Sequence, residues 1–95
     1  MAKPTVKLGC SVVLSRDPDE SVHGRHIAQA VRLAVEQANA RGELPCEVEV
    51  VVGDDGADVE MSIGVGRSFI ADAQVLGVVG TMNSDTSLAV GPLFA

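Results

Sequence analysis

The amino-acid sequence predicts an α/β fold, in which a parallel sheet with strand order 2-1-3 is flanked by helices in three layers. Segments with the period of a strand, at residues 5–14, 47–53 and 75–80, alternate with segments that have the period of a helix. Enough chain separates successive strands to form a helix, so the strands are expected to run parallel with right-handed crossovers. The 95 residues amount to one domain at most.

The composition is that of a folded domain. The charge argues against nucleic acid as a partner, and the short apolar runs argue against a membrane span. Hydrophobic residues make up 46% of the chain and charged residues 21%. The net charge of −6 has the opposite sign to that of nucleic-acid-binding proteins. No apolar run approaches the ~18 residues of a membrane span. We therefore expect neither nucleic-acid binding nor membrane insertion.

The first strand and helix are indicated by their hydrophobic periods. Residues 5–14 carry apolar side chains at every second position, which predicts a strand. Residues 15–23 are polar and contain the turn sequence Asp17-Pro18-Asp19, which predicts a loop. A helix follows, and Gly42 is expected to end it in the left-handed conformation. Its apolar stripe comprises Ile27, Ala30, Val31, Ala34, Val35 and Ala38.

The later elements determine the strand order. Glu47 and Glu49 lie on one face of the second strand, which is typical of an edge strand. Asp58 is expected to cap the second helix, which runs to about Ala71. The third strand, residues 75–80, is apolar at every non-glycine position and is therefore predicted to be interior. We expect Ser84 to cap a third helix that begins at Asp85.

An interior third strand needs a neighbour on its far side, and the chain contains none. We therefore expect residues 1–95 to be a partial domain, the first three βα units of a larger lobe, with the third helix cut off at Ala95. The exposed edge of residues 75–79 and the apolar side chains of that helix also predict self-association as a homodimer.

The two cysteines and the start of the chain bear on its compartment. Cys10 and Cys46 lack the spacing of a metal site and are expected to be free thiols. Residues 1–4 lead directly into the first strand without the features of a secretory signal. Either the protein stays in the cytosol, or a signal has been removed.

The candidate ligand site lies where the strand order reverses. Ligands of open α/β sheets bind outside the carboxyl ends of the strands at this point, which here is bordered by residues 15–24 and 81–87. Ser84, Thr86 and Ser87 cluster at the start of the third helix, where free backbone N–H groups and the helix dipole favour an anion. A ligand carboxylate fits this place. The alternative is an ordinary serine cap without a ligand.

Other kinds of site are not supported. The segment after the first strand has no lysine and lacks the glycines of a phosphate-binding loop. Asp54, Asp55 and Asp58 do not have the spacing of a calcium loop and are expected to be turn and cap residues. His23 and His26 have no matching nucleophile. We therefore expect no catalytic residue, no metal ligand and no cofactor.

Four runs of the sequence carry a resemblance to a known family, from Thr5 to Ala95. They are VKLGCSVVLS, HGRHIAQAVRLAVEQANARGELP, EVEVVVGDDGAD and FIADAQVLGVVGTMNSDTSLAVGPLFA. The most specific parts are Gly24, the pair Asp54-Asp55, and Gly80 followed by Asn83-Ser84. Together they resemble the start of a type I periplasmic binding protein, and in particular the branched-chain amino-acid receptors of ABC transporters.

This resemblance implies the Rossmann-like lobe of a two-lobed receptor that is not an enzyme. Such a receptor is periplasmic or otherwise extracytoplasmic, closes on a solute of the amino-acid class and delivers it to a transporter permease. The resemblance assigns the ligand α-carboxylate to the Ser84 hydroxyl. Asn83, Thr86 and Ser87 lie beside it, and His23 matches a cleft position that is often aromatic in the family. Two alternatives remain open: a ligand-sensing domain of the same fold without transport, and a stand-alone flavodoxin-like module.

Overall fold

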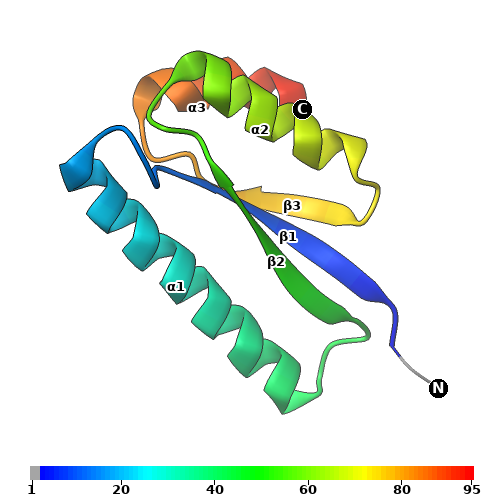
Figure 1. The fold of residues 1–95 in the computed structure, drawn as a ribbon. Helices are drawn as coiled ribbons and strands as arrows, with labels where there is room; N and C mark the ends of the chain where they lie inside the picture. The colour runs from blue at the N-terminus through cyan, green and yellow to red at the C-terminus, as the bar shows by residue number, and fades with distance from the viewer. Residues whose placement is uncertain (1–2) are drawn as a thin grey trace.

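The computed structural model describes residues 3–95 and contains one three-stranded parallel sheet with the order β2-β1-β3. The elements are β1 Thr5–Val12, α1 Pro18–Arg41, β2 Glu47–Asp54, α2 Val59–Ala71, β3 Val75–Val79 and α3 Ser84–Phe94. Helix α1 covers one face of the sheet, over β1 and β2, and helices α2 and α3 lie together on the other face (Figure 1). The predicted fold class and strand order are therefore confirmed.

The strand register places the carboxyl ends of the three strands at one edge. Strand β1 pairs with β2 without interruption, from Thr5 opposite Glu47 to Val12 opposite Asp54. It pairs with β3 up to Cys10 opposite Val79. Because each strand leads into the following helix, all three helices begin at this same edge.

The core is mostly aliphatic, with Phe69 as its buried aromatic residue, and lies on both faces of β1. Cys10 and Val12 are fully buried against Ala28 of α1. On the opposite face Phe69 lies so close to Gly9 that a Cβ added there would be 2.8 Å from the ring. Burial raises the pKa of the Cys10 thiol, and the nearby charge of Arg32 lowers it by less. Cys10 and Cys46 are both free, as expected.

Helix α1 begins earlier than the sequence predicted. The expected loop at residues 15–23 is wrong from Pro18 onward, because Asp17 is an N-cap and Pro18 is the first helical residue. The Asp17 carboxylate accepts hydrogen bonds from the backbone N–H groups of Asp19 and Glu20, both at 3.0 Å. The same three residues that favour a turn therefore start a helix. Its end agrees with the prediction, since Gly42 is left-handed with a φ of 69°.

The caps of the other two helices differ in how well they were predicted. Asp58 caps α2, and its carboxylate accepts a hydrogen bond from the backbone N–H of Met61 at 2.9 Å. The expected cap Ser84 is wrong by one position: Ser84 is the first residue of α3, and the N-cap is Asn83. Asn83 makes no side-chain cap bond to its own helix.

Strand β3 has a hydrogen-bonded neighbour on one side only within residues 3–95. Leu76 is 73% exposed, although the strand is apolar throughout. An apolar groove of about 370 Å³ lies between β3, α2 and α3, and Phe69, Leu76 and Phe94 are among its lining residues. None of the helices in the described part of the chain is both long and apolar enough to cross a membrane.

Candidate functional site

The strand order reverses between β1 and β3, because the connections that follow β1 and that precede β3 lie on opposite faces of the sheet. After β1 the chain passes through α1 on one face and returns to β2, whereas α2 crosses the other face to reach β3 (Figure 1). Adjacent loops therefore diverge between β1 and β3, and the divergence leaves room for a ligand. Two segments border this point: the first turn of α1 and the loop from β3 to α3.

The loop from β3 to α3 packs tightly against the end of β1. Gly80 has a φ of 122°, and a Cβ added to it would lie 2.1 Å from the carbonyl oxygen of Ser11. A glycine is therefore required where the loop leaves the sheet. Further along, the Asn83 carbonyl accepts hydrogen bonds from the Thr86 hydroxyl at 2.9 Å and the Ser87 N–H at 3.0 Å. These contacts hold the first turn of α3 in place.

Four of the five predicted site residues come together in this loop and turn. Ser84 and Ser87 are exposed, and the Ser87 hydroxyl shares a hydrogen bond with that of Thr81. Thr86 is fully buried, and its hydroxyl is already engaged by the Asn83 carbonyl. The Asn83 side chain is partly buried: its Nδ2 donates to Glu20 Oε1 at 2.6 Å, while its Oδ1 is buried without a partner in residues 3–95.

The fifth predicted residue, His23, does not join the other four in this loop and turn. It is exposed on α1, inside the segment that the sequence predicted to be a loop. The sequence analysis missed Glu20, which lies in the first turn of the same helix and contacts Asn83. The sequence does contain a pattern that indicates Glu20. If Asp17-Pro18 is taken as a helix start, Glu20 falls in the first turn of that helix, which lies at the edge where β3 ends.

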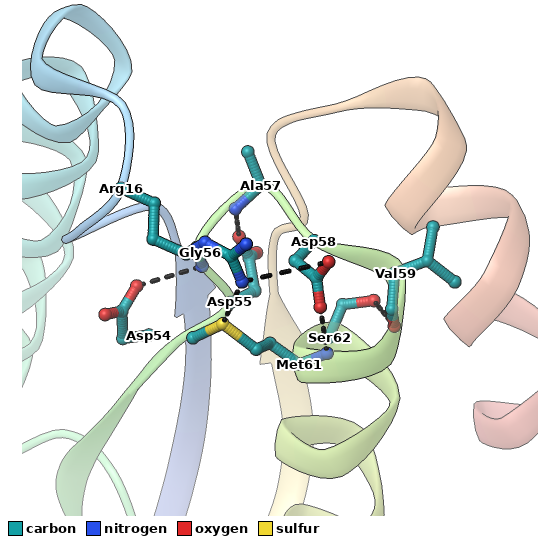
Figure 2. A network of polar contacts seen from close by, with 9 residues as sticks. All are labelled: Arg16, Asp54, Asp55, Gly56, Ala57, Asp58, Val59, Met61 and Ser62. Carbon is teal, nitrogen blue, oxygen red and sulfur yellow. Dashed lines mark hydrogen bonds and ion pairs between the residues drawn. The ribbon is translucent and has the colours of Figure 1, made fainter.

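The loop after β2 is rich in aspartate, and its carboxylates accept hydrogen bonds from nearby backbone N–H groups (Figure 2) and from one serine hydroxyl. Asp55 is fully buried; its Oδ2 accepts from the Ser11 hydroxyl at 3.2 Å and its Oδ1 from the Ala57 N–H at 3.0 Å. Asp54 Oδ1 accepts from the N–H groups of Leu14 and Gly56. The prediction that these aspartates are turn and cap residues is confirmed.

The pKa of Asp54 is shifted by the hydrogen bonds that its carboxylate accepts. Burial raises the pKa of its carboxyl, but hydrogen bonds from Ser15, Leu14 and Gly56 outweigh burial, so the pKa lies below its ordinary value.

On the outer side of the loop, the Arg16 guanidinium lies 3.8 Å from Asp58 and 3.3 Å from the Met61 sulfur (Figure 2). Among residues 3–95, no three His, Cys, Asp or Glu side chains are placed to hold a metal ion.

The first turn of α3 is the part of this edge that is suited to an anion. Within the described residues, the backbone N–H groups of Ser84 and Asp85 have no hydrogen-bond acceptor, and the Ser84 hydroxyl beside them is exposed. The Asp85 carboxylate is exposed in the same turn. An anion bound at this turn would therefore meet N–H and O–H donors that point toward it, rather than a net positive charge.

Known proteins are similar to this chain in sequence and in fold. The sequence model of one family, described as Periplasmic binding protein, matches residues 5–95. The chain is 35% identical over 77 residues to Leu/Ile/Val-binding protein homolog 2 of Brucella abortus (strain 2308), which covers 80% of this chain and 20% of that protein.

Two solved structures are similar over nearly the whole chain. One is a protein from Rhodospirillum rubrum, named as a branched-chain amino acid ABC transporter, with a TM-score of 0.87 and 27% identity over 95% of this chain and 26% of that one. The other is the branched-chain amino acid transporter substrate binding protein of Streptococcus pneumoniae in complex with isoleucine. Its TM-score is 0.80 at 25% identity, over 90% of this chain and 24% of that one.

The chain thus spans about a fifth of the length of the curated relative and about a quarter of the two structures. The match nevertheless includes every helix and strand of the described fold and the whole candidate site. This chain therefore belongs to the periplasmic binding protein family.

Proposed function

We propose that residues 1–95 are the first three βα units of the amino-terminal lobe of an extracytoplasmic solute receptor for an ABC transporter, with an amino acid as its solute. One observation carries this proposal: the first turn of α3 presents exposed serines, and N–H groups without an acceptor in residues 3–95, at the point where the strand order reverses. The names of the relatives support the solute class, since they give Leu/Ile/Val binding and a bound isoleucine.

In this proposal the first turn of α3 binds the α-carboxylate of the solute. The hydroxyls of Ser84 and Ser87 and the N–H groups of Ser84 and Asp85 donate hydrogen bonds to it, in a setting where the helix dipole also favours negative charge. Asn83 and Thr86 shape the turn beneath the ligand, because the Thr86 hydroxyl is engaged and Asn83 is held by Glu20. His23 borders the cleft from α1, and the transporter permease receives the solute.

The proposed function predicts a binding defect for Ser84→Ala. In the intact protein that carries these residues, the substitution should weaken leucine or isoleucine binding by about 1 to 3 kcal/mol, through loss of a hydrogen bond to a charged group. Stability should change by less than about 0.5 kcal/mol, because Ser84 is exposed and is not the N-cap. Isothermal titration calorimetry measures the affinity, and thermal unfolding measures the stability.

Two results would count against parts of this proposal. Unchanged affinity of the Ser84→Ala protein would remove Ser84 from the site, and failure of the unmodified intact protein to bind any amino acid would remove the solute class. The 95-residue chain alone is expected to show no saturable binding at micromolar leucine, since one wall of a cleft leaves most of the ligand in water.

We also propose that the 95-residue chain by itself forms a homodimer through β3. Within residues 3–95 the outer backbone edge of this strand has no partner strand. This edge and the apolar groove beside it lie together on one side of the fold, and both are suited to a second copy. Light scattering should give a dimer mass, and Leu76→Lys should shift it to the monomer, because Leu76 is exposed on β3. Leu33→Lys, at an exposed position of α1, is the control. A monomeric unmodified chain would refute the proposal.

A further inference from the structure

One side-chain hydrogen bond connects the two segments that border the candidate site. Asn83 Nδ2 donates to Glu20 Oε1 at 2.6 Å, and the two residues are 63 positions apart in the sequence. Glu20 belongs to the first turn of α1, and its own N–H is held by the Asp17 carboxylate. Asn83 is the N-cap of α3. The bond therefore joins the amino ends of α1 and α3 across the place where the loops after β1 and β3 diverge.

This bond takes the Asn83 side chain away from the role that its position favours. An asparagine at an N-cap normally accepts a hydrogen bond from the second or third N–H of its helix, here those of Asp85 and Thr86. Asn83 has the extended backbone of a cap residue, with φ −112° and ψ 147°, yet makes no such bond. Its Oδ1 is instead buried and without a partner among the described residues.

The orientation of Asn83 affects the backbone N–H groups that would bind the carboxylate of the proposed ligand. The Thr86 N–H is bonded to the Asp85 carboxylate at 2.9 Å, whereas those of Ser84 and Asp85 have no acceptor in residues 3–95. A self-capping Asn83 would occupy the Asp85 N–H and compete with the ligand for it. In the structure the Asn83 amide is directed toward Glu20 instead.

We infer that Glu20 is a positioning residue, which keeps the amino end of α3 open for a ligand carboxylate by restraining the Asn83 side chain. This inference rests on the proposed function for the identity of the ligand, but not for the behaviour of the helix cap. Glu20 acts through Asn83 and has no contact with the ligand in this scheme.

A ligand-free measurement tests the restraint on the cap. In Glu20→Ala the amide of Asn83 is released and can cap α3, so the Asp85 N–H should exchange with solvent several-fold more slowly than in the unmodified chain. A merely structural contact predicts the reverse, since its loss would loosen the loop and speed exchange. Amide hydrogen exchange followed by NMR on the 95-residue chain measures this. Unchanged or faster exchange at Asp85 would overturn the inference.

Binding by the intact protein provides the second measurement, with leucine as the probe. Glu20→Ala should weaken binding about five- to tenfold, the strength of the competing cap. Glu20→Gln should bind nearly as well as the unmodified protein, because its side-chain oxygen is also an acceptor for Asn83. The double variant Glu20→Ala, Asn83→Ala should recover most of the loss, since it has no side chain that can cap.

The two measurements separate the two hypotheses. If the unmodified intact protein binds no leucine, the proposed solute class fails, and hydrogen exchange at Asp85 still decides the role of Glu20. If leucine binds and Glu20→Ala binds equally well, or if the double variant binds no better than Glu20→Ala, the positioning role is refuted.

Discussion

Gly24→Ala is expected to destabilise the chain by about 3 kcal/mol or more, a large effect for a single methyl group. A Cβ at Gly24 would lie 1.7 Å from the carbonyl oxygen of Val13, and no side-chain rotation can relieve a clash with backbone. Helix α1 would have to move away from the end of β1, and burial around Ala28 would be lost. Thermal unfolding should show a fall in Tm of more than about 10 °C.

Gly64→Ala is the matched control for this substitution. Gly64 is also a helical glycine, in α2, but a Cβ added to it meets nothing within 4 Å. The substitution should raise stability by about 0.5 to 1 kcal/mol, because alanine is the better helix former. Similar Tm changes for the two variants would show that close packing of α1 on β1 does not explain the requirement for Gly24.

Asp55→Ala is expected to cost about 3 kcal/mol, measured by chemical denaturation. The substitution removes a fully buried acceptor and leaves the buried Ser11 hydroxyl and the partly buried Ala57 N–H without a partner; an unsatisfied buried donor costs about 1 to 3 kcal/mol. Asp55 also connects β1 to the loop before α2, so the loss should loosen the edge that carries the candidate site.

Two further variants test this explanation of Asp55. Asp55→Asn should lose less stability than Asp55→Ala, because the amide oxygen still accepts a hydrogen bond from the Ala57 N–H. Asp19→Ala removes an exposed carboxylate from the first turn of α1 and should cost less than about 1 kcal/mol. If Asp55→Ala were as mild as Asp19→Ala, the buried hydrogen bonds would contribute little to stability.

The elements of the fold could be predicted because their signals are local. The strand β1 and the cap Asp58 each depend on residues a few positions apart, and the structure confirms them. The stripe of α1 is confirmed only in part: Ile27, Val31, Val35 and Ala38 are partly buried, whereas Ala30 and Ala34 are exposed and Ala28, outside the stripe, is buried. The strand order also followed from neighbouring side chains. Glu47 and Glu49 indicated an edge strand, and β2 lies at the edge of the observed sheet.

The start of α1 and the cap of α3 were predicted wrongly because one local pattern is compatible with two conformations. Asp17-Pro18-Asp19 is as typical of a turn as of a helix start, and tertiary packing selects the helix. Ser21 is buried and Gly24 packs against Val13, so the first turns of α1 lie against the end of β1. Asn83 and Ser84 are equally favoured as caps by residue type, and the observed cap is Asn83.

The contacts that shape the candidate site lay outside the reach of any sequence period. Ser11 bonds to Asp55 across 44 positions, and Glu20 bonds to Asn83 across 63. Hydrophobic periodicity places an element and its buried face, but it carries no information on which polar side chains meet when different elements converge at a sheet edge. The sequence therefore indicated the region and the serines of the candidate site, whereas the folded chain determined that Thr86 is buried and that Asn83 is hydrogen-bonded to Glu20.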